Sequence, residues 1–268
     1  MRHIKIVYYY IINISCSISG GPPRPFWRAF EVPSLEEPDF SVTFLSPSFI
    51  GHGLEEIPLT GQPSRCYRHG QELMLVNRDW SAAQILPLHK PEMAETFLTQ
   101  VFDAHAARRE MLHIHCAVIR YKGAGVLFLG PSGIGKTTQA ERWRDFRSAA
   151  IINGDMGYVQ RTKNGFLAWG TPWHGSSPYC ENESVPLKAL VVLKQAPENT
   201  LRELSGYEKV REVSGSVFYP NWAEDGVELC LGTLDSLLKE IPVYRLDNRA
   251  DEGAVALLEN ELERRLLI

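Results

Sequence analysis

The sequence predicts an α/β protein with a small β-rich region at its N-terminal end, and two observations carry this prediction. The stretch GVLFLGPSGIGKTTQAERW, residues 125–143, passes from an apolar strand through a glycine-rich turn into a helix pattern. The first 90 residues contain short strand-like pieces separated by Gly and Pro, whereas strand-like and helix-like segments alternate afterwards. We therefore expect two parts, residues 1–90 and 91–268.

The N-terminal part is expected to form a largely antiparallel β region. Residues 12–19, INISCSIS, alternate strictly and place Ile12, Ile14, Cys16 and Ile18 on one face, as in a half-buried strand. Further strand-like pieces follow at 40–45 and 71–80.

The second part begins with a change of period at Pro91. Apolar residues at helical spacing predict a helix over 91–112, and residues 113–123 and 124–130 predict a strand hairpin that turns at Lys122 and Gly123. The remaining expected strands are 149–155, 166–173, 187–195, 227–233 and 241–246, and the remaining expected helices are 136–147, 234–241 and 251–267.

Composition narrows the class of partner and compartment. The chain has 268 residues and a formal net charge of -4, without a long basic run, so we expect neither nucleic acid nor an anionic membrane surface as its partner. No apolar run reaches the ~18 residues of a membrane span.

Five scattered cysteines favour reduced thiols in a cytoplasm. Residues 1–14 superficially imitate a secretory signal, but three consecutive tyrosines and no small-residue cleavage site argue against one.

Residues 130–137, GPSGIGKT, fit G-x-x-x-x-G-K-[ST] without a mismatch, between a predicted strand and a predicted helix. Glycines let successive backbone N–H groups converge on phosphate oxygens, and the helix N-terminus adds its dipole. Lys136 is expected on the β and γ phosphates, and the Thr137 hydroxyl on Mg²⁺. The alternative is a chance glycine turn, which the strand and helix context disfavours. The expected nucleotide-contacting residues are Gly130, Pro131, Ser132, Gly133, Ile134, Gly135, Lys136, Thr137 and Thr138.

Asp155 is the candidate carboxylate, because it ends an apolar strand about twenty residues after the loop. It would hold Mg²⁺ or accept the proton of an attacking hydroxyl; the alternative is an Asx turn in NGDMG. His113 and His115 share one strand face, but no third ligand lies near in sequence, so half-buried, hydrogen-bonded histidines are favoured over a zinc site. The loop 169–184 shapes a pocket mouth or is merely a solvated connection, and Trp173 is a candidate core residue.

The order of His115, a fifteen-residue interval, GPSGIGKTT, a helix and IINGD resembles the catalytic core of the HPr kinase/phosphorylase family, within the group similar to ATP-dependent phosphoenolpyruvate carboxykinase. The resemblance is good over about residues 112–160. Residues 170–199 and 241–262 are also similar to shorter bacterial HPr-kinase-related proteins, which include kinases acting on lasso-peptide precursors. The family has two adjacent aspartates where this chain has Gly154 and Asp155, and the HPr-docking signature of the longer members is not recognisable here.

The resemblance implies a P-loop kinase fold with ATP on the glycine loop, Thr137 and Asp155 serving Mg²⁺ or base catalysis, and His115 facing the transferring phosphoryl group. It implies a catalytic set of Asp155, His115 and Lys136. The acceptor would be a hydroxyl of a peptide or protein serine, or of a small molecule, in peptide natural-product modification. Related proteins commonly form homo-oligomers. Two alternatives stay open: a nucleotide-binding regulator without catalysis, suggested by the single aspartate, and a carboxykinase-like metabolic enzyme.

Overall fold

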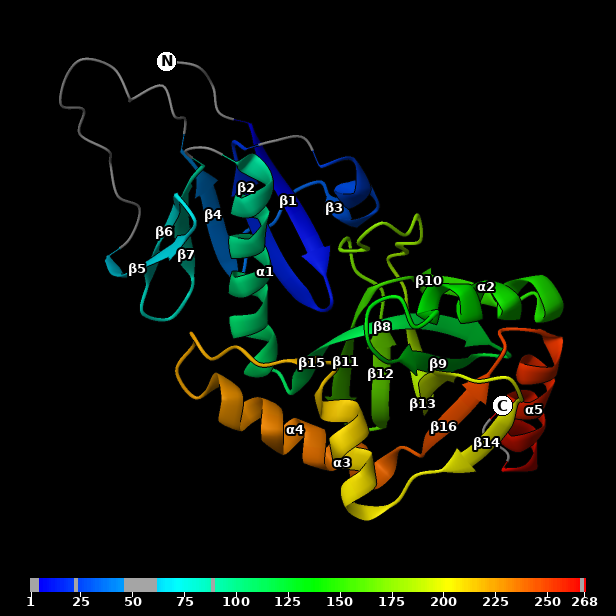
Figure 1. Cartoon of the computed structure of the whole chain (residues 1–268). Helices are drawn as coiled ribbons and strands as arrows, with labels where there is room; N and C mark the ends of the chain where they lie inside the picture. Colours follow the sequence, from blue (N-terminus) through cyan, green and yellow to red (C-terminus); the bar gives the residue numbers. More distant parts are fainter. Residues whose placement is uncertain (1–4, 22–23, 46–61, 88–89, 266–267) are drawn as a thin grey trace. The chain divides into compact units, whose positions relative to one another are not determined.

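The computed structural model describes residues 5–21, 24–45, 62–87, 90–265 and 268. The chain divides into two compact units, residues 1–105 and 106–268, so the division falls inside the helix that begins at Pro91. Each unit contains a mixed β-sheet and at least one helix (Figure 1). The architecture is therefore mixed α/β, as the sequence predicts.

The first unit is a mixed sheet, in which the described strands follow the order β3-β1-β2-β4-β7-β6-β5. Its pairs are antiparallel except for β2–β4 and β4–β7, which are parallel. Ile12 and Asn13 have φ values of 49° and 63° and form the turn of the first hairpin, so the strand expected from Ile12 begins at Ile14. The elements are β1 Ile6–Ile11, β2 Ile14–Ser19, η1 Pro25–Phe30, β3 Glu31–Val32, β4 Phe40–Phe44, β5 Pro63–His69, β6 Glu72–Asn77, β7 Ala82–Leu86 and α1 Pro91–Ala107.

Helix α1 packs on this sheet through aromatic contacts. The Phe102 ring lies 4.8 Å from Phe40 and 6.1 Å from Trp27, and His105 Nε2 lies 3.1 Å from the Trp80 carbonyl oxygen. The helix ends at Ala107, not at Leu112 as the periodicity suggests, because Met111 and Leu112 already pair in a strand of the second unit.

The second unit is a larger sheet with helices on both faces. Its strands follow the path β10-β8-β11-β12-β13-β16-β14, with β15 paired to β8 and β9 paired to both β8 and β13. The hairpin turn at Lys122 and Gly123 occurs as predicted. The elements are β8 Met111–Tyr121, β9 Ala124–Leu129, α2 Lys136–Arg147, β10 Ala150–Asn153, β11 Met156–Thr162, β12 Gly165–Trp169, β13 Ser184–Gln195, β14 Thr200–Glu203, α3 Gly206–Ser214, β15 Val217–Phe218, α4 Gly226–Glu240, β16 Val243–Asn248 and α5 Glu252–Arg264.

Three neighbouring strands of this sheet run parallel: β9, β13 and β16. Their carboxyl ends lie at one edge, where open α/β sheets bind ligands. The glycine loop leaves β9 at this edge and enters α2.

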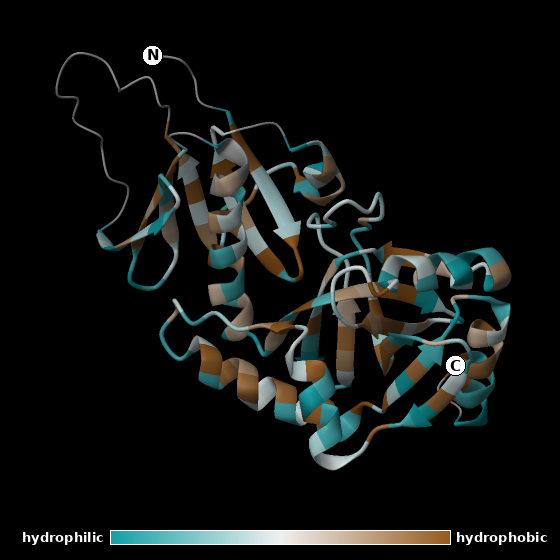
Figure 2. Ribbon diagram, in the orientation of Figure 1, coloured by the Kyte–Doolittle hydropathy of each residue, from teal (hydrophilic) through white to brown (hydrophobic). Residues whose placement is uncertain are grey.

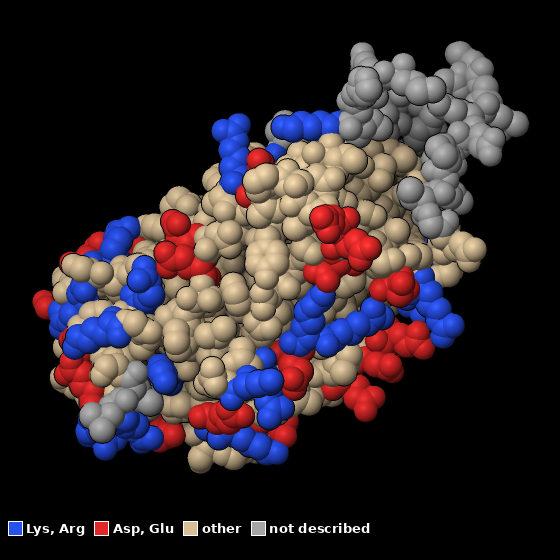
Figure 3. All heavy atoms as spheres, turned by 180° about the vertical axis from the view of Figure 1, so that it is seen from behind, with Lys and Arg blue, Asp and Glu red and all other residues tan. Residues whose placement is uncertain are grey.

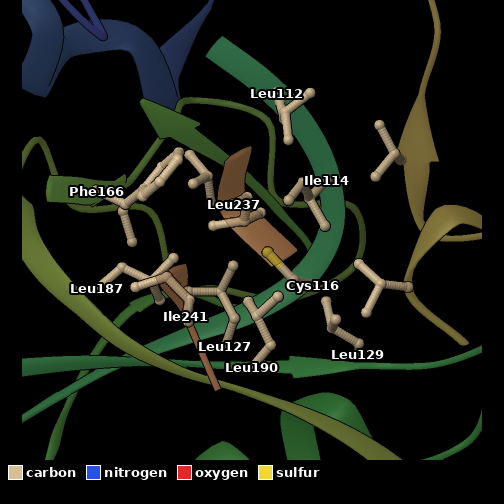
Figure 4. Packing of buried hydrophobic residues seen from close by; sticks show 14 of the residues in the cluster. Leu112, Ile114, Cys116, Leu127, Leu129, Phe166, Leu187, Leu190, Leu237 and Ile241 are labelled. Atoms are coloured by element: carbon tan, nitrogen blue, oxygen red, sulfur yellow. The ribbon is translucent and has the colours of Figure 1, made fainter. Parts of the chain in front are cut away.

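Two hydrophobic clusters hold the second unit together, one on each face of the sheet. On one face Leu127 and Leu190 pack with Leu237 of α4 (Figure 4), in a cluster that also contains Val243 and Leu234. On the other face Phe128, Val191 and Leu246 pack with helices α2 and α5, through Trp143, Leu258 and Leu262. Figure 2 shows the same layering, with hydrophobic residues on β8 and β9 and mainly hydrophilic residues on α2.

One sequence prediction is wrong here: residues 227–233, expected as a strand, form the first half of α4. Val227, Leu229 and Leu231 alternate as in a strand, yet all three are exposed in the described chain. The buried positions are Cys230, Leu234, Leu237 and Leu238, which recur at helical spacing. Burial against the sheet therefore overrides the local period of two.

Charges of both signs are mixed over the surface seen in Figure 3, in line with the small net charge. Among the described residues, no helix has the length and apolar character needed to cross a membrane.

Candidate active site

The glycine loop between β9 and α2 has the backbone that a phosphate cradle needs. Gly130, Gly133 and Gly135 have φ values of 138°, 78° and 106°, which side-chain-bearing residues rarely adopt. A Cβ atom at Gly133 would meet nothing within 4 Å, and at Gly135 the nearest atom would be Thr138 Cβ at 4.0 Å. Gly133 and Gly135 thus serve the backbone conformation and leave open space above the loop, whereas a Cβ atom at Gly130 would lie 3.0 Å from Ile134 Cγ2.

Lys136 begins α2 and is buried, with 6% of its surface exposed. Its Nζ donates hydrogen bonds to the carbonyl oxygens of Gly130, at 3.1 Å, and Pro131, at 3.3 Å. Burial lowers the pKa of Lys136, and the charge of Asp155 partly opposes this shift. Within the described residues Lys136 forms no salt bridge, so its charge can pair with an anionic ligand.

Asp155 lies between β10 and β11, opposite the middle of β8. The Cys116 backbone N–H donates to the Asp155 carbonyl oxygen at 2.9 Å, and Met156 pairs with His115 across the sheet. This register places His115 Nε2 3.1 Å from Asp155 Oδ1, with about a quarter of each side chain exposed. The two residues form a dyad that reaches solvent.

The pKa of His115 is lowered, mainly by burial and next by the nearby charge of Lys136, while Asp155 acts in the opposite direction. The imidazole is therefore neutral at neutral pH and able to accept a proton.

The Asx turn considered as the alternative for this segment exists, and Asn153 forms it. Asn153 is fully buried, and its Oδ1 accepts the backbone N–H groups of Asp155 and Met156, each at 2.8 Å. Its Nδ2 donates to the carbonyl oxygens of Thr171 and Trp173, each at 3.0 Å. The turn leaves the Asp155 carboxylate facing His115. Asn153 thus makes the turn, and the Asp155 side chain stays available for the role proposed for it.

The loop 169–184 packs directly on the Asp155 turn. A Cβ atom at Gly154 would lie 1.9 Å from Ser177 Oγ, and one at Gly175 would lie 2.3 Å from Asp155 Oδ2. Thr171, also fully buried, donates from Oγ1 to the Met156 carbonyl oxygen at 2.8 Å. Much of this segment is thus structural support for the Asp155 turn.

Thr137 joins the two halves of the site, because its Oγ1 donates to the Gly154 carbonyl oxygen at 2.8 Å. The Thr137 hydroxyl therefore bonds to the residue that directly precedes Asp155 in the sequence. Among the described residues, no three His, Cys, Asp or Glu side chains form a group that could hold a metal alone. A hydroxyl, a carboxylate and ligand phosphates suit Mg²⁺, which seldom relies on an all-protein cage.

The chain belongs to the ScmC family. Residues 91–252, more than half of its length, match the family model described as "SynChlorMet cassette protein ScmC". No curated protein gives a significant match. Among solved structures, the Hpr(Ser) kinase/phosphatase from Coxiella burnetii matches with 12% identity and a TM-score of 0.35, over 57% of this chain and 97% of that one. At that level the likeness carries no argument about function.

His113 and His115 share one face of β8 in this ScmC family member, but they differ in exposure. His113 is 4% exposed, not half-buried, and its ring stacks on Tyr158 at 4.5 Å and lies 4.5 Å from Phe218. Trp173, expected in the core, is only partly buried, 6.4 Å from the His113 ring. His113 is accordingly a packing residue, and His115 is the histidine presented to the site.

A cavity of about 500 Å³ opens beside the loop and His115. It is lined by the start of the loop, the end of β13 and the C-terminal end of α3, and it includes Arg245 of β16. Sequence reasoning missed Asn153, Ser177 and Arg245. An Asn directly before Gly-Asp was a signal for the first; nothing local singles out the other two.

Proposed function

We propose that this ScmC family member is an ATP- and Mg²⁺-dependent kinase that transfers the γ-phosphoryl group to a hydroxyl of a peptide, a protein or a small molecule. One observation carries the proposal: a glycine loop with a buried lysine is joined through Thr137 and Gly154 to a partly exposed Asp155–His115 dyad. A phosphate cradle and a proton acceptor are the two parts that such transfer needs.

The loop residues 130–138 would hold the triphosphate, with Lys136 exchanging its contacts with the loop carbonyl oxygens for phosphate oxygens. Thr137 and Asp155 would hold Mg²⁺, which neutralises charge on the phosphates when bound. Asp155 orients the acceptor hydroxyl, and the dyad takes its proton. Lys136, Thr137, Asp155 and His115 each have a role in this scheme.

A second candidate is a nucleotide-binding regulator without catalysis. It is favoured by the presence of a single carboxylate in the turn, since Ser177 fills the space in which a side chain at position 154 would lie. Both candidates use the same loop, but only a kinase moves the phosphoryl group.

The deciding experiment is incubation of the purified chain with γ-labelled ATP and MgCl₂ in the presence of serine-containing peptides and free serine. Transfer of label to an acceptor supports the kinase. Saturable nucleotide binding without transfer supports the regulator. Absence of any nucleotide binding to the folded chain contradicts both.

A further inference from the structure

The cavity beside His115 is built at the carboxyl edge of the parallel strands. Its floor is formed by Val192 and Leu193 of β13, and the loop residues Gly130, Pro131 and Ile134 form one wall. A volume of about 500 Å³ lies within the range of small-molecule sites. The space is therefore large enough for a ligand group beside the loop.

Two cationic side chains line this cavity, Lys194 and Arg245. The register pairs Val192 with Arg245 on neighbouring strands, and Lys194 follows Val192 by two residues, so both cations lie on the same sheet face. Arg245 is held by a bond from Nε to Asp247 Oδ1 at 2.9 Å, which leaves its terminal nitrogens free of any hydrogen bond within the described chain. Lys194 makes no side-chain hydrogen bond or ion pair with the described residues.

Arg245 forms an ion pair with Asp247, whose backbone pairs with Lys194, and the carboxylate in the cavity lining has a different partner. Glu212 lines the cavity but accepts from Arg211 Nη2 at 2.7 Å. A guanidinium with free terminal N–H groups is a good partner for carboxylate or phosphate oxygens.

His115 belongs both to the cavity and to the dyad with Asp155. A hydroxyl placed in the cavity near His115 would thus face the proton-accepting pair, with the phosphate loop next to it. This shared residue connects ligand binding in the cavity with chemistry on the loop.

We propose that the cavity receives the phosphoryl acceptor, and that Arg245 and Lys194 bind an oxyanion, a carboxylate or a phosphate ester, that the acceptor carries near its reactive hydroxyl. The inference rests on the proposed kinase function. In the reaction the acceptor O–H bond breaks and its proton passes to the Asp155–His115 dyad, the acceptor oxygen bonds to the γ phosphorus, and the bond to the β–γ bridging oxygen breaks and releases ADP. Arg245 is a specificity residue in this arrangement, not a catalytic one.

The test uses the full chain saturated with Mg²⁺ and AMP-PNP, so that the loop is filled. Inorganic phosphate or acetate is then titrated at constant ionic strength, and affinity is measured by calorimetry and by the thermal midpoint. We expect one anion site, weakened about tenfold or more by Arg245→Gln and less by Lys194→Gln, because a hydrogen bond to a charged group is lost. Tighter phosphate binding would indicate a phosphate ester, and tighter acetate binding a carboxylate.

Arg264→Gln is the matched control, since Arg264 is exposed on α5 and outside the cavity, and it should leave anion affinity unchanged. Arg245→Lys keeps a cation and a long side chain if Arg245→Gln fails to fold, and it should bind anions with intermediate affinity. A variant that binds AMP-PNP as tightly as the wild type is correctly folded.

Three results overturn the inference. Anion affinity that is equal in the wild type and Arg245→Gln shows that Arg245 does not bind the oxyanion. Anion binding that disappears once AMP-PNP is present assigns the cavity to the nucleotide. A wild-type chain that does not bind AMP-PNP contradicts the proposed function itself, whereas the first two results leave that function standing.

Discussion

The glycines on the two sides of the site differ in what surrounds them. At Gly133 and Gly135 of the loop, an added Cβ atom would meet nothing closer than 4.0 Å, and the constraint is a positive φ. At Gly154 and Gly175, around Asp155, it would lie 1.9 Å from Ser177 Oγ and 2.3 Å from Asp155 Oδ2. There is thus open space beside Gly133 and Gly135, whereas the protein's own loop fills the space beside Gly154 and Gly175.

The difference suggests a division of labour. Substitutions on the loop side should change ligand affinity, because the space above the loop is open to a ligand. Substitutions on the Asp155 side should change the free energy of unfolding and the rate of proton transfer, because the groups there already contact one another. The following predictions test this separation, from the largest expected effect to the smallest.

Substitution Lys136→Ala should reduce phosphoryl transfer about 10³-fold or more, because it removes the lysine charge that the proposed mechanism places on the transferring group. The protein should stay folded, since within the described part of the chain the Lys136 side chain bonds only to two loop carbonyl oxygens. ATP turnover and circular dichroism provide the measurements, with the exposed Lys239→Ala as the control. Undiminished turnover would exclude the proposed mechanism.

Substitution Asp155→Asn should lower transfer about 10²-fold while nucleotide affinity persists. The amide keeps the size of the side chain but cannot accept a proton. Single-turnover rates and the nucleotide Kd separate the two effects, and Asp235→Asn, on the exposed surface of α4, is the matched variant. Unchanged transfer would remove Asp155 from catalysis.

Substitution Gly154→Ala should destabilise the fold by about 1–3 kcal/mol through overpacking against Ser177, and Ser177→Gly should restore much of the loss. Gly133→Ala should cost about 1–2 kcal/mol through its φ of 78°, and Ser177→Gly should not relieve it. Denaturant unfolding of the two double-mutant cycles measures both couplings. Equal couplings would mean that the two sides of the site do not differ as described.

The smallest effect concerns His115, whose pKa in the folded chain lies below its ordinary value because of burial and Lys136. Since the unfolded chain binds the proton more readily, the folded state should lose stability as pH falls below about 6.5, the unfolded pKa. Transfer should also decline as the pH falls through the folded pKa. NMR titration of the imidazole should show a further decrease of the pKa in Asp155→Asn and an increase in Lys136→Ala. Shifts in the opposite directions would contradict the charge arrangement inferred around His115.

How far the sequence predicts this protein depends on how local each feature is. The hairpin at Lys122 and Gly123 and the helix Lys136–Arg147 occur where expected, because turn glycines and the Gly-Lys-Thr run act within a few residues. The prediction of a strand at 227–233 is wrong, because the apolar residues that alternate there lie on the exposed side of helix α4. Whether residues 130–138, His115 and Asp155 act on ATP stays a prediction.

The sequence by itself determined the strand, glycine loop and helix, since their backbone preferences depend on neighbouring residues. Only the tertiary structure decided that His115 lies 3.1 Å from Asp155, that Asn153 supports the turn and that Ser177 occupies the space beside Gly154. It also decided that Arg245, 130 positions beyond His115 in the sequence, lines the same cavity as that histidine. Sheet register and loop packing join residues far apart in the chain, and no local pattern encodes those distances.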